Sequence, residues 1–242
     1  MRAPVPLALS YGWLRRFHAP AKTTLVRSKT QKKLLSERGF RQLQVWPGAV
    51  DTTLFRPRGK RALCLPRPIS MYMGRVAVEK GLDDFLRLSL PGSKVVIGGG
   101  PDLGRLQEDY RNALFLGPKY GEELAQLLSA ADVFVFPSRT DTLGLVMLEA
   151  MACGVPVAGY PVPGPQDVVR DGYTGALDEN LESAVFRALG VNPQACVEYA
   201  AEHDWRRSTE RFLHAQQPHD PGHVTPVAPA APAVFSDGPR AT

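Results

Sequence analysis

Short apolar runs alternate with longer amphipathic segments along residues 69–157. The runs at residues 69–73, 94–97 and 132–136 are rich in β-branched, aromatic or methionine side chains, and a glycine or proline follows each. Runs of this kind predict buried strands, and the segments between them repeat their apolar positions at helical spacing. Because alternating strands and helices form parallel sheets, the pattern predicts an α/β fold built on a parallel sheet.

Weaker forms of the same alternation flank this region. Residues 22–27 and 42–46 predict two strands, and Ser28 is expected to cap a basic helix that ends at Gly39. Beyond residue 157 the pattern predicts a short helix that ends at Gly172, one short strand at residues 173–177, and three further helices at residues 180–189, 193–202 and 205–216. From residue 217 the chain is rich in proline and alanine, which predicts a disordered tail at residues 217–242.

The unit at residues 132–157 is expected to form a strand, a polar loop, a helix and a strand. Parallel sheets bind ligands outside the carboxyl ends of their strands, where the next helix presents free N–H groups. Asp141 lies in the loop and Glu149 eight positions later, so the two carboxylates would be up to about 12 Å apart and could bracket an elongated ligand. Alternatively, Asp141 is only a helix-capping loop residue and Glu149 a solvated helix residue.

Two cations follow the strand at residues 69–73. Arg75 and Lys80 lie five positions apart in a glycine-bounded turn, before an amphipathic helix predicted at residues 82–90. Both could reach one diphosphate, the guanidinium as a fork and the ammonium as a point charge. The next strand ends in a run of three glycines closed by Gly100, which either lets the backbone approach a ligand or forms a tight turn. It completes neither a dinucleotide fingerprint nor a P-loop.

These segments together resemble a known family. Asp141-x7-Glu149, followed by Ala-Met-Ala-Cys-Gly-Val-Pro-Val, resembles the E-x7-E signature of retaining GT-B glycosyltransferases of the family 4, or group 1, type. The turn that carries Arg75 and Lys80 is similar to the family's G-R-x-x-x-E-K-G segment. Two departures stand out: Asp141 replaces the first Glu, and Leu143 replaces the usual Phe.

The resemblance implies a role for each charged residue. Arg75 and Lys80 would hold the diphosphate of a nucleotide-sugar donor and stabilise the leaving nucleotide. Asp141 would accept hydrogen bonds from the sugar hydroxyls, and Glu149 would accept them from the ribose diol. Arg75, Lys80 and Asp141 are therefore the predicted catalytic residues. The implied reaction transfers a hexose to an acceptor hydroxyl, with retention at the sugar carbon.

The resemblance also implies the surroundings of the donor. Backbone around Leu143, Gly144 and Leu145 would support the phosphate and sugar, and Gly100 would allow close approach. The donor would be a UDP- or GDP-sugar and the acceptor a lipid or a saccharide. No metal or other cofactor is expected, and no nucleic acid is expected as a partner.

The implied fold is the carboxyl-terminal half of a GT-B enzyme, a Rossmann-like sheet with helices on both faces. Residues 47–57 look like the segment that joins the two domains of such enzymes. We therefore expect residues 1–57 to be a remnant of the acceptor-side domain with the linker, and residues 58–216 to be the donor domain. The alternative is a truncated, non-catalytic nucleotide-binding module that needs a partner domain. Trp205, at the start of the last helix, is interpreted as either an anchor between domains or a core residue.

Composition adds three constraints. The 242 residues are 44% hydrophobic and 22% charged, an ordinary globular balance, and the net charge of +5 is concentrated in the first 41 residues. That excess fits an acidic partner, such as anionic lipid headgroups or a phosphorylated acceptor, or a solvated helix face. The three cysteines are far apart and indicate neither disulfides nor a zinc site. A cytoplasmic location is expected, and the basic residues leave open a peripheral position at the inner face of the membrane.

Overall fold

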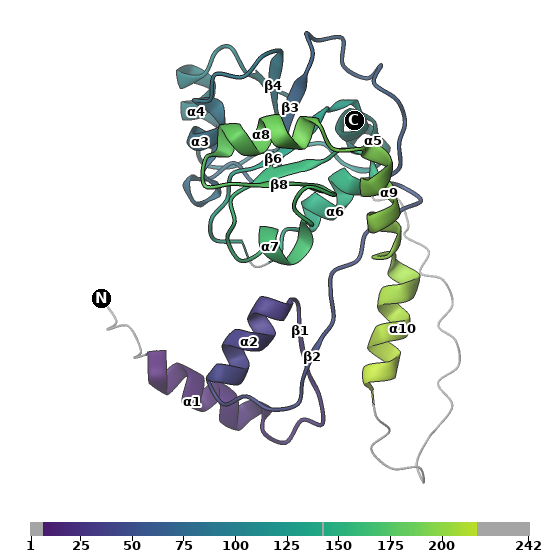
Figure 1. Cartoon of the computed structure of the whole chain (residues 1–242). Helices are drawn as coiled ribbons and strands as arrows, with labels where there is room; N and C mark the ends of the chain where they lie inside the picture. The colour runs from purple at the N-terminus through teal and green to yellow at the C-terminus, as the bar shows by residue number, and fades with distance from the viewer. Residues whose placement is uncertain (1–6, 142, 217–242) are drawn as a thin grey trace, which may run out of the picture.

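The computed structural model describes residues 7–141 and 143–216 (Figure 1). A six-stranded sheet dominates it, with strand order β5-β4-β3-β6-β7-β8 and parallel pairing throughout. Its strands are β3 (Ile69–Met73), β4 (Ser93–Ile97), β5 (Leu114–Phe115), β6 (Val133–Phe136), β7 (Val157–Gly159) and β8 (Gly175–Leu177). The predicted parallel α/β sheet is confirmed.

The order of the strands reverses once, in the middle of the sheet. The chain passes from β3 outward through β4 to β5, returns to place β6 on the free side of β3, and continues outward through β7 to β8. Met71 in β3 therefore has Val95 of β4 on one side and Phe134 of β6 on the other. Loops that follow β3 and β6 diverge to opposite sides, which opens a crevice at their carboxyl ends.

Helices cover both faces of this sheet. One face packs against α3 (Leu82–Leu86), α4 (Leu103–Asp109) and α8 (Leu181–Leu189). The other packs against α5 (Gly121–Ala130), α6 (Leu145–Ala152) and α9 (Pro193–Ala201). Along β3, Met71 and Met73 point into one layer and Tyr72 into the other. Burial on both faces is the reason that these strands read as continuous apolar runs.

Helix α3 ends four residues earlier than the apolar spacing predicts. The last residue of α3 is Leu86, and a 3₁₀ turn at Val78–Lys80 precedes the helix. The ammonium group of Lys94 donates hydrogen bonds to the carbonyl oxygens of Leu86 (2.6 Å) and Leu88. These bonds satisfy carbonyl groups that one more helical turn would otherwise satisfy. A lysine on the neighbouring strand therefore ends the helix.

A smaller unit precedes the main sheet. Strands β1 (Thr24–Val26) and β2 (Leu43–Val45) pair in parallel, with helices α1 (Leu7–His18) and α2 (Lys29–Glu37) beside them. The predicted N-cap is confirmed, because Ser28 Oγ accepts a hydrogen bond from the Gln31 N–H. The remaining helices are the short α7 (Pro165–Val168) and the longer α10 (Trp205–Ala215), and α10 extends from α9 toward the two-stranded sheet (Figure 1).

The contact between α10 and the small unit is made by an unexpected tryptophan. Trp46 Nε1 donates to the Ser208 carbonyl at 3.0 Å, and its ring centroid lies 5.5 Å from that of Phe212. Trp205 is 57% exposed, so its interpretation as a core residue is wrong. The domain boundary at residue 57 stays a prediction, and the predicted tail at residues 217–242 lies outside the described residues.

We predict that Gly98→Ala lowers the free energy of unfolding by at least about 2 kcal/mol. Gly98 has φ +140°, and a Cβ there would overlap the Gly74 carbonyl oxygen. Gly104→Ala is the matched control, because Gly104 lies in α4 with open space around it, and alanine is expected to add up to about 1 kcal/mol there. Urea unfolding of the two variants measures the difference. Equal stabilities would refute the close approach of the two loops.

Candidate functional site

The loops that follow β3 and β6 meet at the reversal of the sheet. Lys80 ends the 3₁₀ turn after β3, and its Nζ lies 2.7 Å from Oδ2 of Asp141, in the loop after β6. Both side chains are about one-fifth exposed, 23% for Lys80 and 21% for Asp141. The structure therefore brings together two of the predicted site residues and pairs them with each other, which the sequence did not predict.

Arg75 lies on the same edge but reaches toward solvent. Its side chain is 65% exposed, and its contact with Glu79 is a long one of 3.6 Å. The backbone at this position is fixed, because the Tyr72 hydroxyl donates to the Arg75 carbonyl at 2.8 Å. The backbone of Arg75 is therefore held in place, while its guanidinium has only a weak contact with Glu79. Such a guanidinium is available to bind an incoming anion.

A cavity of about 330 Å³ opens beside Arg75. It is lined by the loops after β3, β4 and β5, including Gly74, Gly99, Lys119 and Tyr120. Lys119 forms an ion pair with Glu123 at 2.6 Å, whereas the Tyr120 ring is exposed. The cavity has the position of a ligand site in an open parallel sheet.

Gly100 allows the loops that follow β3 and β4 to pack closely against each other. A Cβ at this residue would overlap the carbonyl oxygen of Val76, and the Val76 N–H donates to the Gly99 carbonyl at 2.9 Å. Gly98 and Gly99 line the cavity, and Gly100 is not among its lining residues in the described part of the chain. This geometry fits the tight-turn interpretation of Gly100, and its predicted contact with a ligand stays a prediction.

Helix α6 begins directly at the site. Gly144 is its N-cap residue, with φ +72°, so the interpretation of Asp141 as a helix cap is wrong. Leu143 is buried and Leu145 is partly exposed. Gly48, in the segment joining the small unit to the main sheet, packs so closely on Leu145 that a Cβ would overlap it. The linker therefore forms part of the wall beside the amino end of α6.

Glu149, in the second turn of α6, is partly buried. Burial raises the pKa of its carboxyl from 4.5 to about 6. None of the hydrogen bonds and ion pairs found among residues 7–141 and 143–216 involves its carboxylate. The interpretation of Glu149 as a solvated helix residue is therefore wrong. A half-desolvated carboxylate without a partner is a good acceptor for ligand hydroxyls.

Two residues that the sequence did not single out support the loop after β6. The Arg139 guanidinium lies 3.5 Å from the centroid of the Tyr160 ring, and the Tyr160 hydroxyl donates to Asp84 Oδ2 at 2.9 Å. Tyr160 directly follows β7, so its position at the carboxyl end of a strand was a signal that sequence reasoning could have used. These contacts hold the loop that carries Asp141.

A contact between the small unit and the main sheet was also missed. The Thr30 N–H and hydroxyl both donate to Asp167 Oδ1, at 3.1 and 3.0 Å. Asp167 lies in α7, which begins after Gly164, and a Cβ at Gly164 would come within 2.6 Å of the Asp141 carbonyl oxygen. The amino end of α2 is therefore tied to the wall of the site. No local signal could have shown this, because the two residues are 137 positions apart.

The described residues contain neither a group of metal-binding side chains nor a membrane-spanning helix. Within residues 7–141 and 143–216, no three His, Cys, Asp or Glu side chains gather as a group that could hold a metal ion. In the same part of the chain, no helix is long and apolar enough to cross a bilayer. The cysteines Cys64, Cys153 and Cys196 are free, and burial raises the pKa of the Cys153 and Cys196 thiols to about 12.

A family model described as glycosyl transferases group 1 matches residues 67–189, about half of the chain. The chain belongs to this family. The matched region begins just before β3 and ends with α8, so it contains both members of the Lys80–Asp141 pair and Glu149.

Curated relatives extend the match. A GDP-mannose-dependent alpha-mannosyltransferase of Mycobacterium tuberculosis is 32% identical over 182 residues, which cover 72% of this chain and 48% of the relative. The sulfoquinovosyl transferase SQD2 of Arabidopsis thaliana is 32% identical over 233 residues, which cover 84% of this chain and 46% of the relative. The chain thus spans about half the length of these curated relatives.

Solved structures share the fold of this group 1 transferase chain. Anabaena HepE in complex with UDP superposes with a TM-score of 0.73 at 16% identity, covering 86% of this chain and 67% of HepE. Sucrose-phosphate synthase from Thermosynechococcus elongatus superposes with a TM-score of 0.72 at 26% identity, covering 85% and 60%. The predicted Rossmann-like, GT-B type of fold is confirmed.

We predict that Glu149→Gln raises the free energy of unfolding at pH 7 by about 1–2 kcal/mol. The folded state holds the Glu149 proton more tightly than the unfolded state, since burial raises its pKa to about 6. Wild-type stability is therefore lost as the pH rises from about 4.5 through 6, and the glutamine variant does not share this loss. Urea unfolding at pH 4 and pH 7 tests this. An advantage of the same size at both values would contradict the assignment.

Proposed function

We propose that this chain carries the donor site of a retaining glycosyltransferase that moves a hexose from a nucleotide-diphosphate sugar to an acceptor hydroxyl. The observation that carries the proposal is the meeting of Lys80 and Asp141 at 2.7 Å, at the point where the strand order reverses. A cation for phosphate and a carboxylate for hydroxyls lie side by side there, as a sugar diphosphate requires.

The two cations supply the electrostatic part of the chemistry. Negative charge grows on the diphosphate as the bond to the sugar breaks, and groups fixed around it stabilise that charge. Lys80 is partly buried, so its charge acts in a less polar environment than water. Arg75 is exposed and would close onto the diphosphate from the solvent side. With two cations in place, the proposed reaction needs no metal ion.

Asp141 would take part by exchanging partners. In the structure its carboxylate neutralises Lys80. When a donor binds, Lys80 would turn to the diphosphate and Asp141 to the sugar hydroxyls, so the ammonium keeps an anionic partner and the carboxylate keeps hydrogen-bond donors. A nucleoside diphosphate without sugar takes Lys80 but leaves Asp141 without a partner, which costs free energy in a partly buried site. The ion pair would therefore favour the sugar-bearing donor over the nucleotide product.

The remaining predicted residues would position the donor. Glu149 would accept the ribose hydroxyls, and these bonds would offset the desolvation of its carboxylate. Backbone N–H groups at the amino end of α6, around Leu143, Gly144 and Leu145, would face the phosphate and sugar. The cavity beside Arg75 would take the base. Relatives support UDP or GDP, since HepE was crystallised with UDP and one relative is named for GDP-mannose.

A lipid or saccharide acceptor and a peripheral position at the inner membrane face complete the proposal. The basic residues of the small unit support them through their attraction to anionic surfaces. A second candidate is a nucleotide-binding module that acts only with a partner domain. It is favoured by one observation, that the chain spans about half the length of its relatives.

We predict that Lys80→Ala weakens binding of UDP or GDP, whichever the protein binds, by about 1.5–3 kcal/mol, the usual value of a charge-assisted hydrogen bond. Arg75→Ala is expected to weaken binding by an amount near the lower end of this range, because Arg75 is more exposed than Lys80. Lys33→Ala is the control, since Lys33 is an exposed lysine of α2. Calorimetric titration measures the three variants. Unchanged affinity in both site variants would remove the diphosphate assignment.

We predict that Asp141→Asn binds the nucleoside diphosphate up to about tenfold more tightly, because Lys80 no longer has a competing carboxylate. The same variant should lose most of its preference for the sugar-bearing donor. The measurement is the ratio of the two dissociation constants, for wild type and variant, by calorimetry. A variant that weakens both ligands equally would show that Asp141 does not exchange partners.

A further inference from the structure

The loop after β6 lies along the turn and the helix that follow β3. A Cβ at Gly81 would come within 2.9 Å of the Pro137 carbonyl oxygen, so the two backbones are in close contact there. The ion pair of Lys80 with Asp141 joins the same two segments. The proposed partner exchange removes this ion pair when a donor binds. Asp141 then stays beside the sugar only if other contacts hold its loop.

Three side chains that have no part in the proposed chemistry form a second connection. Arg139, two residues before Asp141, places its guanidinium 3.5 Å from the centroid of the Tyr160 ring. The Tyr160 hydroxyl donates to Asp84 Oδ2 at 2.9 Å, and Asp84 lies in the first turn of α3. We call these three residues the Arg139–Tyr160–Asp84 relay. The relay runs from the loop that carries Asp141 to the helix that directly follows the turn of Lys80.

The central member of the relay is well shielded from water. Tyr160 is 5% exposed, and burial together with the Asp84 carboxylate raises the pKa of its hydroxyl. The hydroxyl therefore stays protonated and donates a charge-assisted hydrogen bond to Asp84. A guanidinium over a buried aromatic ring is also attracted more strongly than one over an exposed ring. Both contacts of the relay are thus of the kind that holds a loop firmly.

The other side-chain contacts of this loop are long and lie at the surface. The Thr140 hydroxyl donates to the Glu79 carbonyl at 3.4 Å, and Arg139 forms an ion pair of 3.4 Å with Glu179, whose side chain is 73% exposed. Exposed pairs of this kind contribute little, because water and salt screen them. Among the described residues, the relay is therefore the main side-chain connection that remains when Lys80 leaves Asp141.

The two ligands of the proposed site depend on this loop to different degrees. A nucleoside diphosphate would bind Lys80 and make no contact with Asp141, whereas a nucleotide sugar would use both residues. A small displacement of the loop would therefore weaken the nucleotide sugar and leave the nucleoside diphosphate nearly unaffected. Specificity of this kind depends on how precisely the second contact is held in place.

We propose that the Arg139–Tyr160–Asp84 relay fixes the position of Asp141 and thereby sets the preference of the site for a sugar-bearing donor over the nucleoside diphosphate. Arg139 and Tyr160 are positioning residues, which act through Asp141 and do not touch the donor. The inference rests on the proposed function in one respect, the contact of Asp141 with the sugar hydroxyls.

The first test is calorimetric titration of the full chain with UDP, UDP-glucose, GDP and GDP-mannose, using the pair that the wild type binds. Tyr160→Phe removes the hydrogen bond to Asp84 and keeps the ring beneath Arg139. It should weaken the nucleotide sugar about three- to tenfold and change the affinity for the nucleoside diphosphate by less than about twofold. Arg139→Gln should shift the ratio of the two dissociation constants in the same direction.

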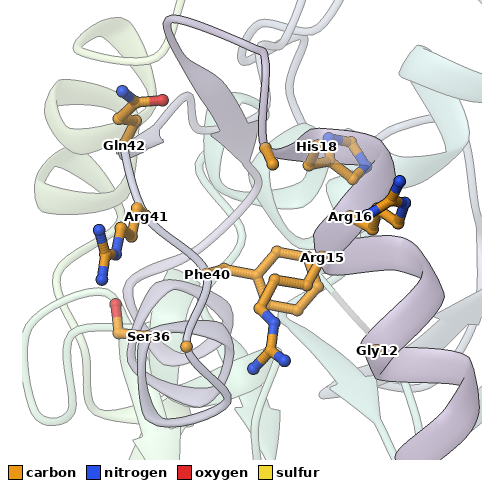
Figure 2. A pocket seen from close by; sticks show the side chains of 10 residues that line it. Gly12, Arg15, Arg16, His18, Ser36, Phe40, Arg41 and Gln42 are labelled. Carbon is orange, nitrogen blue, oxygen red and sulfur yellow. The ribbon is translucent and has the colours of Figure 1, made fainter.

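Each variant has a matched control. Tyr110→Phe removes a hydroxyl that donates at 2.8 Å to Asp83, the neighbouring aspartate of α3. Arg16→Gln removes an exposed arginine that lines a cavity of about 960 Å³, and all the lining residues of that cavity belong to the small unit (Figure 2). Both control variants should bind the two ligands like the wild type.

A double variant shows whether the relay acts through Asp141. In Asp141→Asn the preference for the sugar-bearing donor is already mostly lost. Adding Tyr160→Phe should then change the ratio of the two dissociation constants by less than about twofold, because residues that act in one chain of contacts are not additive. A tyrosine that served stability alone would change neither ratio, or would change the affinity for both ligands alike.

A second measurement needs no ligand. Lys80→Ala removes the ammonium group from Asp141, as a bound donor is proposed to do. In this background, Tyr160→Phe should speed hydrogen–deuterium exchange of residues 133–141 at least about threefold, because the loop opens more often. Tyr110→Phe in the same background should leave the exchange of this segment unchanged.

Two outcomes would overturn the inference. One is that Tyr160→Phe weakens both ligands equally or neither of them. The other is that exchange of residues 133–141 is the same in Lys80→Ala with and without Tyr160→Phe. If the wild type bound none of the four ligands, the proposed function would fail and the selectivity with it, while the exchange measurement would still show whether the relay holds the loop. The two failures are therefore distinguishable.

Discussion

The parallel pairing of β3 with β6 is the constraint on which the rest of the structure depends. These are the two central strands, with β4 and β5 on one side and β7 and β8 on the other. Their side chains fill both apolar layers, so neither strand can shift without exposing buried methionine or phenylalanine side chains. Since both strands point the same way, the loops that follow them must emerge at the same edge. A site between these loops is a consequence of the pairing.

Most charged side chains that the structure describes at that edge are paired. Lys80 and Asp141 neutralise each other, and Arg139 is held by the Tyr160 ring and by Glu179 at 3.4 Å. Glu149 has no such partner among residues 7–141 and 143–216, and its burial raises the pKa of the carboxyl to about 6. Structures tolerate an unpaired, half-buried carboxylate where a ligand can complete its hydrogen bonds. The stability lost at Glu149 is therefore consistent with a ligand site at this place.

The small unit is attached to the rest of the chain by a few local contacts, and its described core residues form a cluster separate from those of the main sheet. Thr30 binds Asp167, Trp46 packs on α10, and Gly48 lies against Leu145. Each contact reaches an element close to the site or to the final helix. The position of the small unit is thus coupled to the walls of the candidate donor site.

The sequence by itself determined the strands, the order of the elements and the family, and it supplied the candidate residues of the site. Strands such as β3 and β6 are buried on both faces and therefore stand out as continuous apolar runs. Arg75, Lys80 and Asp141 could be selected as candidates because functional side chains of parallel sheets follow the carboxyl ends of strands, and Glu149 by its spacing from Asp141. The family of the chain could be identified from the same residues, since their spacing in the chain is preserved whatever the exact loop geometry.

The tertiary structure alone decided which of these residues are partners. Lys80 and Asp141 are 61 positions apart, and periodicity reports whether a residue is buried on average but not which residue it contacts. The same limit explains why Lys94 ends α3, why Trp46 and not Trp205 packs on the last helix, and why Glu149 is desolvated. Each depends on distances across the fold, set by the packing of elements that are remote in sequence. Local propensity therefore fixed the elements of this protein, and packing fixed their contacts.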